Sequence, residues 1–74
     1  MSLASPNMAG RLLRGRVVKG QFPTQDGPWR VPVAIKGFLG NRYITSRKAL
    51  EEGAYVDLIE RIDGGIELAQ PEAA

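Results

Sequence analysis

Apolar and polar residues alternate with a period of two in several short stretches of this chain. The clearest stretch is residues 29–37, in which successive odd-numbered positions are apolar, namely Trp29, Val31, Val33 and Ile35. Such alternation is typical of a β-strand that buries one face. Four other stretches follow a similar pattern: residues 11–20, 42–46, 54–62 and 66–70. The pattern therefore predicts five strands and no long helix.

Turn residues separate the predicted strands. Nine glycines and five prolines are spread along the chain, as is usual in small all-β domains. Residues 21–28 are expected to form a loop. Residues 63–65 (Asp-Gly-Gly) are expected to form a tight hairpin, because glycine accepts the positive φ that such turns need. Residues 47–53 provide at most one short helical turn, with Ser46 as its N-cap.

Five short strands in 74 residues bury a core best by curling into a barrel, which also leaves few exposed edges. We therefore expect an all-β fold, a small five-stranded barrel of OB type; an SH3-like connection of the strands stays open. Pro32 has no N–H to donate, so the second strand should lie at an edge or contain a bulge there. The barrel is expected over residues 11–70. A disordered lead-in, residues 1–10, would include residues added for expression, and residues 71–74 would form a tail.

The composition narrows the possible chemistry. The chain has no cysteine and no histidine, which excludes disulfides, the usual zinc and copper sites, and histidine-dependent catalysis. Glu51 and Glu52 are adjacent and diverge, whereas a catalytic carboxylate pair must be fixed in one cleft. Ser46 has only Lys48 as a possible base, and no phosphate-binding glycine motif occurs. We therefore expect no enzyme activity, no cofactor, no metal and no small-molecule substrate.

Charge is distributed unevenly along the chain. Residues 1–50 contain nine Lys and Arg residues and one acid, whereas residues 51–74 contain one Arg and seven acids. Such asymmetry is one indication of an anionic partner. It also arises when folding brings the two halves together, so that opposite charges interleave on one surface. The sequence leaves both interpretations open.

Glycines and apolar residues in the second half of the chain follow the closing pattern of a known β-domain: Ala49, Leu50, Gly53, Val56, Leu58, Ile59, Ile62, Gly64, Ile66 and Leu68. Upstream residues fit the same layout: Gly15, Val17, Val18, Trp29, Arg30, Val31, Tyr43, Thr45 and Ser46. On these residues the chain resembles, over about residues 15–70, the C-terminal soluble domain of the NfeD family. It departs from that family at residues 21–28, where a Leu-x-Pro-x-Gly-like loop is common, and it carries two extra residues around Arg61 and Gly65 relative to the family pattern.

The resemblance implies an OB-type, non-catalytic module on the cytoplasmic side of a membrane protein, joined to it through an upstream membrane segment. It implies a role in regulating membrane protease activity, with stomatin- or flotillin-like membrane proteins as partners. The protease activity of longer family members belongs to a separate domain.

Two groups of residues are candidates for such a role. The first comprises hydrophobic residues in predicted loops, which could dock a partner: Phe22, Phe38 and Leu39. The second comprises basic residues near the N-terminal end, where anionic lipid headgroups would attract them: Arg11, Arg14, Arg16 and Lys19. Basic residues also serve to protect the edge of a sheet from pairing with other chains, so the second assignment has a purely structural alternative.

A nucleic-acid-binding OB or SH3-like barrel is the alternative function. Single strands stack on aromatic platforms interleaved with arginine. Tyr43 with Arg42, and Tyr55 with Arg61, are candidate pairs, whereas Trp29 is either a platform residue or part of the core. The acids of residues 51–74 argue against a nucleic-acid partner, because a small barrel has little surface on which to keep them away from phosphates.

Overall fold

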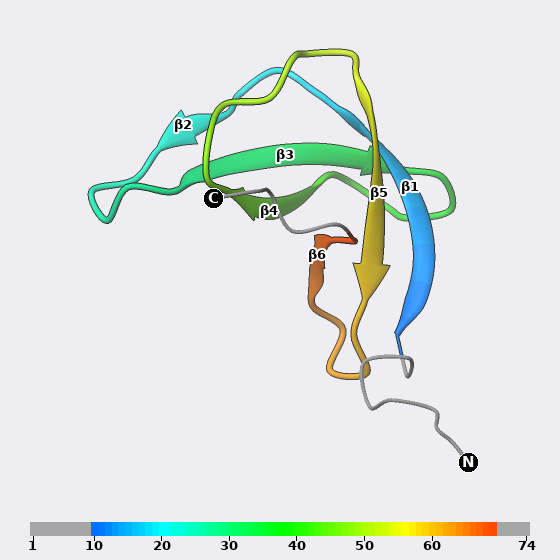
Figure 1. Ribbon diagram of the computed structural model, residues 1–74. Coiled ribbons are helices and arrows are strands. Elements are labelled where there is room, and N and C mark those ends of the chain that lie inside the picture. Colours follow the sequence, from blue (N-terminus) through cyan, green and yellow to red (C-terminus); the bar gives the residue numbers. More distant parts are fainter. Residues whose placement is uncertain (1–9, 70–74) are drawn as a thin grey trace.

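The computed structural model describes residues 10–69, and the lead-in over residues 1–9 and the tail from residue 70 lie outside the described part (Figure 1). Within residues 10–69, six strands form one antiparallel sheet: β1 Arg11–Val17, β2 Phe22–Pro23, β3 Trp29–Ile35, β4 Arg42–Ser46, β5 Tyr55–Glu60 and β6 Ile66–Leu68. All five predicted strands are present: β4 has the predicted bounds, and the other four are shorter than predicted. β2 is an addition, because two residues of the predicted loop pair with the start of β3.

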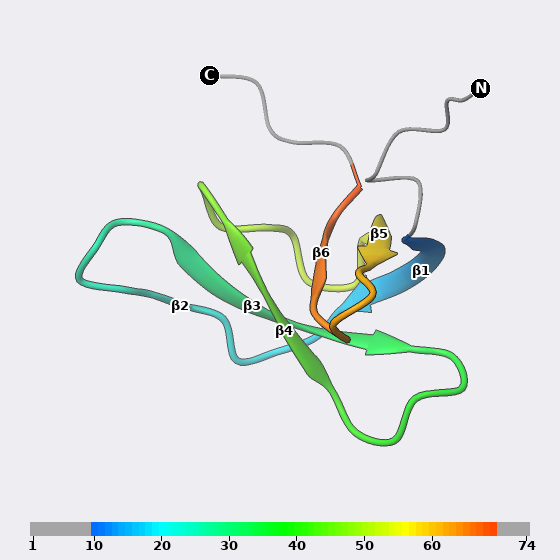
Figure 2. The ribbon, with the colours of Figure 1, turned by 90° about the horizontal axis from the view of Figure 1, so that it is seen from below.

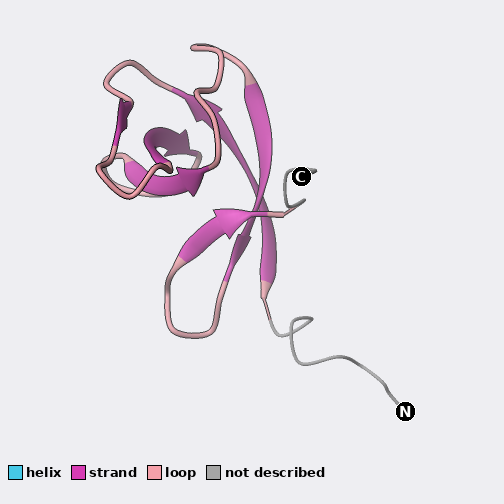
Figure 3. Ribbon diagram, turned by 60° about the vertical axis from the view of Figure 1, so that its left-hand side comes forward, coloured by secondary structure: helices cyan, strands magenta, loops and turns pink. Residues whose placement is uncertain are grey.

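The described residues contain strands, turns and loops and no helix (Figure 3). The helical turn allowed over residues 47–53 does not form. Ser46 is buried, and its Oγ accepts from the Lys48 N–H at 3.3 Å and lies 2.6 Å from the Lys48 carbonyl oxygen. The serine therefore closes a local turn, which competes with helix initiation.

β1 is the central strand of the sheet. It pairs with β3 on one side and with β5 on the other, while β4 pairs with the far side of β3 and β6 with the far side of β5. The sheet curls so that β4 and β6 approach each other (Figure 2). No ladder joins these two strands within residues 10–69. The predicted curled all-β fold is thus confirmed, in the form of a half-barrel.

The core lies on the inner side of this curl. Its buried residues come from four strands: Val17, Val31, Val33, Ile35, Ile44 and Leu58. Trp29 is half-buried and packs against them, which confirms the predicted inner face of residues 29–35. Gly15 lies where β1 crosses this core, and a Cβ there would be only 2.8 Å from Leu58 Cδ1. The strands approach this closely because the glycine has no side chain.

Two predictions about individual positions were wrong. Ile62 has the same parity as Leu58 and would share its face if the strand ran over residues 54–62 as expected, but it is 83% exposed. β5 ends at Glu60, so Ile62 lies in the following turn and the period of two no longer applies to it. Pro32 does not mark an edge or a bulge, because β3 is an interior strand that pairs continuously with β4 through Pro32 and Tyr43.

Pro32 is tolerated in this interior strand because of a local break on one side. Its carbonyl accepts from the Val18 N–H at 3.0 Å. The N and C=O of one strand residue point to the same side, so the missing N–H of Pro32 also faces that side. There β1 has ended at Val17, and β2 begins only at Phe22. Val18 lies opposite Pro32 in the register of β1 with β3. The bond that is missing is therefore the reciprocal one, from Pro32 N to the Val18 carbonyl, and the ladder of β1 with β3 ends at this point.

The β5–β6 hairpin agrees with the prediction from its Asp-Gly-Gly sequence. The Arg61 N–H donates to the Gly65 carbonyl at 2.8 Å, and the Gly64 N–H donates to the Arg61 carbonyl at 2.9 Å. Gly64 has a φ of +91°, a conformation that glycine adopts without strain. Asp63 Oδ1 accepts from the Gly65 N–H at 2.8 Å, which fixes the turn.

Candidate functional site

The outer side of β2, β3 and β4 carries aromatic and basic side chains in adjacent positions. Phe22 pairs with Arg30, and Arg30 pairs with Thr45, so these three residues form a row across the strands. They alternate with the buried Val31 and Ile44, and therefore face away from the core. Tyr43 is two positions from Thr45 and shares its face. We call Phe22, Arg30, Tyr43 and Thr45 the β2–β4 face.

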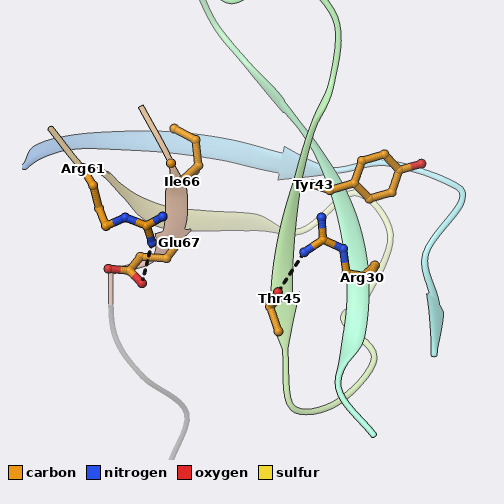
Figure 4. A pocket seen from close by; sticks show the side chains of 7 residues that line it. Arg30, Tyr43, Thr45, Arg61, Ile66 and Glu67 are labelled. Atoms are coloured by element: carbon orange, nitrogen blue, oxygen red, sulfur yellow. Dashed lines mark hydrogen bonds and ion pairs between the residues drawn. The ribbon is translucent and has the colours of Figure 1, made fainter. Parts of the chain in front are cut away.

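Contacts within the β2–β4 face hold Arg30 at its centre. Its Nη1 donates to Thr45 Oγ1 at 2.9 Å, and its Cζ lies 5.8 Å from the centre of the Tyr43 ring (Figure 4). The rings of Phe22 and Tyr43 meet edge-to-face at 6.2 Å and an interplanar angle of 60°. The rings remain 48% and 46% exposed, respectively. Arg30 forms no ion pair within the described residues, so its charge is not neutralised by a carboxylate.

A hollow of about 340 Å³ adjoins this face, in the seam between β4 and the β5–β6 hairpin. One wall consists of Arg30, Tyr43 and Thr45. The opposite wall consists of four residues of the hairpin: Arg61, Gly65, Ile66 and Glu67. The volume falls in the range of about 300–1,000 Å³ that is common for ligand sites. The hollow is thus large enough for a small aromatic group.

Ion pairs neutralise the arginine on the hairpin wall. Arg61 Nε donates to Asp63 Oδ1 at 3.2 Å, and Arg61 Nη1 donates to Glu67 Oε1 at 3.3 Å. The pKa of Asp63 is lowered mainly by the hydrogen bond from the Gly65 N–H and, to a smaller extent, by the hydrogen bond from Arg61. The hydrogen bond and charge of Asp63 raise the pKa of Arg61. Two carboxylates thus outweigh one guanidinium here, whereas the β2–β4 wall is cationic.

Comparison with models of known protein families, with curated proteins and with solved structures found no match to this chain. Within residues 10–69, no helix is long and apolar enough to cross a membrane. The same residues contain no group of three metal-ligating side chains. The NfeD resemblance stays a prediction, and the functional inference below depends on the geometry of the faces.

The basic residues expected near lipid headgroups lie on β1 and just after it. Arg11 donates to Glu60 at 2.7 Å, and Arg14 lies 3.4 Å from Asp57. Arg16 Cζ lies 6.0 Å from the centre of the Tyr55 ring, and Lys19 is exposed. Folding therefore interleaves the charges of the two sequence halves along β1 and β5. Lipid contact through Arg11, Arg14, Arg16 and Lys19 stays a prediction.

The three hydrophobic residues expected to dock a partner do not form one patch. Phe22 pairs with the first part of β3 and lies beside Tyr43, whereas Phe38 and Leu39 follow the end of β3, between β3 and β4. Phe38 is half-buried against the core, and Arg42 Cζ lies 4.9 Å from its ring centre. Leu39 is 98% exposed. Partner binding at these residues stays a prediction.

The aromatic platform suggested by the sequence has different members in the structure. Arg30 and Phe22, not Arg42, surround Tyr43, and Arg16, not Arg61, contacts Tyr55. Sequence reasoning missed Arg30 because its neighbours depend on strand register. One signal could have found it: the Asp-Gly step at residues 26–27 is a hairpin turn, and closing it places Phe22 opposite Arg30.

Proposed function

We propose that this chain binds single-stranded nucleic acid on the β2–β4 face. The observation that carries the proposal is the pair of half-exposed rings, Phe22 and Tyr43, around an arginine that has no carboxylate partner within residues 10–69. Stacking of one base on an aromatic side chain contributes about 1–3 kcal/mol. A guanidinium supplies charge-assisted hydrogen bonds to a phosphate. The face offers both kinds of contact side by side.

The strand order supports an OB-type assignment. Without the two-residue β2, neighbouring strands run β4, β3, β1, β5, β6, which is the order of an OB barrel. In an SH3-like barrel, the first strand pairs with the last. OB folds bind oligonucleotides on their second and third strands and on two flanking loops. The corresponding elements here carry the β2–β4 face and the hollow, although analogy of fold alone would be a weak argument for function.

Two of the acids that argue against a nucleic-acid partner lie away from the β2–β4 face. Asp57 and Glu60 lie on β5 and pair with arginines of β1, away from β2 and β4. Residues 22–50 contain five Lys and Arg residues and a single acid, Asp26. A positive field over this part of the surface attracts a polyanion and speeds its association.

Fluorescence anisotropy with a labelled oligothymidylate at low salt tests the proposal. Arg30→Ala and Tyr43→Ala should each weaken binding by about tenfold, as expected for the loss of one phosphate or stacking contact. The logarithm of the affinity should fall with the logarithm of salt concentration, by about 0.7 per phosphate contact. Tyr55→Ala is the matched control, because Tyr55 of β5 is also an exposed tyrosine beside an arginine, Arg16 of β1. Absence of binding, or an equal loss in the control, would refute the proposal.

A second candidate function is the protein-interaction module that the NfeD resemblance implies, the cytoplasmic domain of a membrane protein that docks stomatin- or flotillin-like partners. The observation in its favour is Leu39, a large apolar side chain that is 98% exposed at the β3–β4 turn. Leu39→Ser should weaken capture of such a partner, while Leu12→Ser, at another exposed leucine, should not. If the full-length protein remains soluble after cell fractionation, this candidate fails.

A further inference from the structure

The two walls of the hollow differ in charge, and this difference orients any nucleic acid bound on the β2–β4 face. Arg30 lies on one wall and has no carboxylate partner in the described part of the chain. On the other wall Glu67 and Asp63 outweigh Arg61. Phosphates are attracted to the first wall and repelled by the second. The sugar–phosphate backbone of the nucleic acid would follow β3 and β4, so its bases would point across the seam toward Glu67.

We infer that the hollow is a base pocket that prefers guanine, with Glu67 as the specificity-determining residue; this inference rests on the proposed function. A carboxylate only accepts hydrogen bonds, and its two oxygens offer about four lone-pair positions. Arg61 Nη1 occupies one position on Glu67 Oε1, at 3.3 Å. The Glu67 side chain remains 53% exposed. It can therefore accept further donors from a ligand in the hollow.

Guanine alone among the bases presents two adjacent donors, N1–H and the N2 amino group, on its Watson–Crick edge. Adenine and cytosine present one amino group beside an acceptor nitrogen, and thymine presents one N–H between two carbonyls. Each of these acceptors would face the carboxylate unfavourably. Recognition of unstacked bases through this edge is common in single-strand-binding proteins.

The opposite wall supports the same orientation of the base. Tyr43 provides a half-exposed ring on which a base can stack. Thr45 Oγ1 already accepts from Arg30 at 2.9 Å, and the hydroxyl hydrogen remains able to donate to an acceptor such as guanine O6 or N7. The hollow thus places donors on the β4 side and acceptors on the β6 side. Guanine carries complementary groups, with acceptors on one side and donors on the other.

The test compares oligothymidylates of one length that carry a single central guanine, hypoxanthine, adenine or cytosine. Anisotropy titrations with the unmodified protein should show the guanine oligomer binding about tenfold more tightly than oligothymidylate alone, as expected for one bidentate base contact. Hypoxanthine lacks the N2 amino group and should lose most of this preference. Glu67→Gln should bring the ratio of guanine to thymine affinity close to one. Glu52→Gln, at an exposed glutamate outside the hollow, should keep the ratio.

The outcomes separate this inference from the proposed function. If oligothymidylate binds and the four substituted oligomers bind equally, the guanine pocket is refuted and the β2–β4 face remains supported. If Glu67→Gln retains the full preference, another group reads the base and the inference is wrong. If no oligomer binds at low salt, both are refuted. The hypoxanthine comparison needs no variant, so a folding defect cannot obscure the answer.

Discussion

The β1–β5 pair and the β2–β4 face present similar residues to solvent but hold them differently. On the first, Arg14 lies opposite Asp57 and Arg11 opposite Glu60. On the second, Arg30 lies opposite Phe22 and Thr45. An exposed arginine opposite a carboxylate contributes about 0–1 kcal/mol to stability and offers little net charge to a ligand. The charge of an arginine opposite a ring and a hydroxyl is not compensated by a carboxylate, so it is available to an anionic ligand. The cross-strand neighbour decides which role an arginine has.

The largest effect is expected in the core beneath the β1–β5 pair. Leu58 of β5 is fully buried, whereas Leu39 beside β4 is 98% exposed. Leu58→Ala should lower the free energy of unfolding by about 2–5 kcal/mol, because it removes buried apolar surface and leaves a cavity. Leu39→Ala should change it by less than about 0.5 kcal/mol. Urea unfolding followed by circular dichroism measures both, and similar losses would contradict the assignment of the core.

A smaller loss is expected where β1 crosses that core. Gly15→Ala adds a methyl group 2.8 Å from Leu58 Cδ1 and 3.4 Å from Val33 Cβ. The neighbours have to shift, and overpacking of this kind costs about 1–3 kcal/mol. Ala34→Ser, at an exposed position on the adjacent strand β3, is the control and should change stability by less than about 0.5 kcal/mol. A neutral Gly15→Ala in the same urea experiment would show that the strands are farther apart.

One substitution should make the β2–β4 face resemble the β1–β5 pair. Thr45→Glu places a carboxylate opposite Arg30, where Thr45 Oγ1 now accepts its hydrogen bond. The new ion pair should occupy the guanidinium and weaken oligonucleotide binding by about tenfold or more, the equivalent of one charged hydrogen bond. Thr45→Gln has the same size without the charge and should weaken binding less. Equal effects of the two variants, measured by anisotropy, would show that charge is not the deciding factor.

The smallest effect concerns the hairpin that forms the acidic wall. The Gly65 N–H and Arg61 lower the pKa of Asp63. A lowered pKa in the folded state means that the contribution of Asp63 is present above its ordinary pKa and is lost as the pH falls through the lowered value. The NMR shift of the Gly65 amide should therefore follow a titration step below the usual aspartate range. Asp63→Asn should abolish that step; if the step persists, another carboxylate controls the turn.

Much of the scaffold could be predicted from the sequence, because a period of two and the turn residues are local signals. The inner face of residues 29–35 and the hairpin at residues 63–65 are examples. The candidate site was harder to predict from the sequence, because it depends on which strands pair and in which register. The two residues of β2 are too few to show a period, and Pro23 hides the strand further. The pairing of Arg30 with Phe22, rather than with an acid, follows only from that register.

The break beside Pro32 lets the β2–β3 part of the sheet change in sequence independently of the β1–β5 ladder. β2 pairs with β3, while the six-residue ladder of β1 with β5 runs from Arg11 to Arg16, before the break. Residues 18–28 can therefore gain or lose residues without shifting that ladder, in the way that exposed loops tolerate insertions. The segment that supplies Phe22 is free to diversify from one relative to another on an unchanged frame, and new ligand preferences would arise there first.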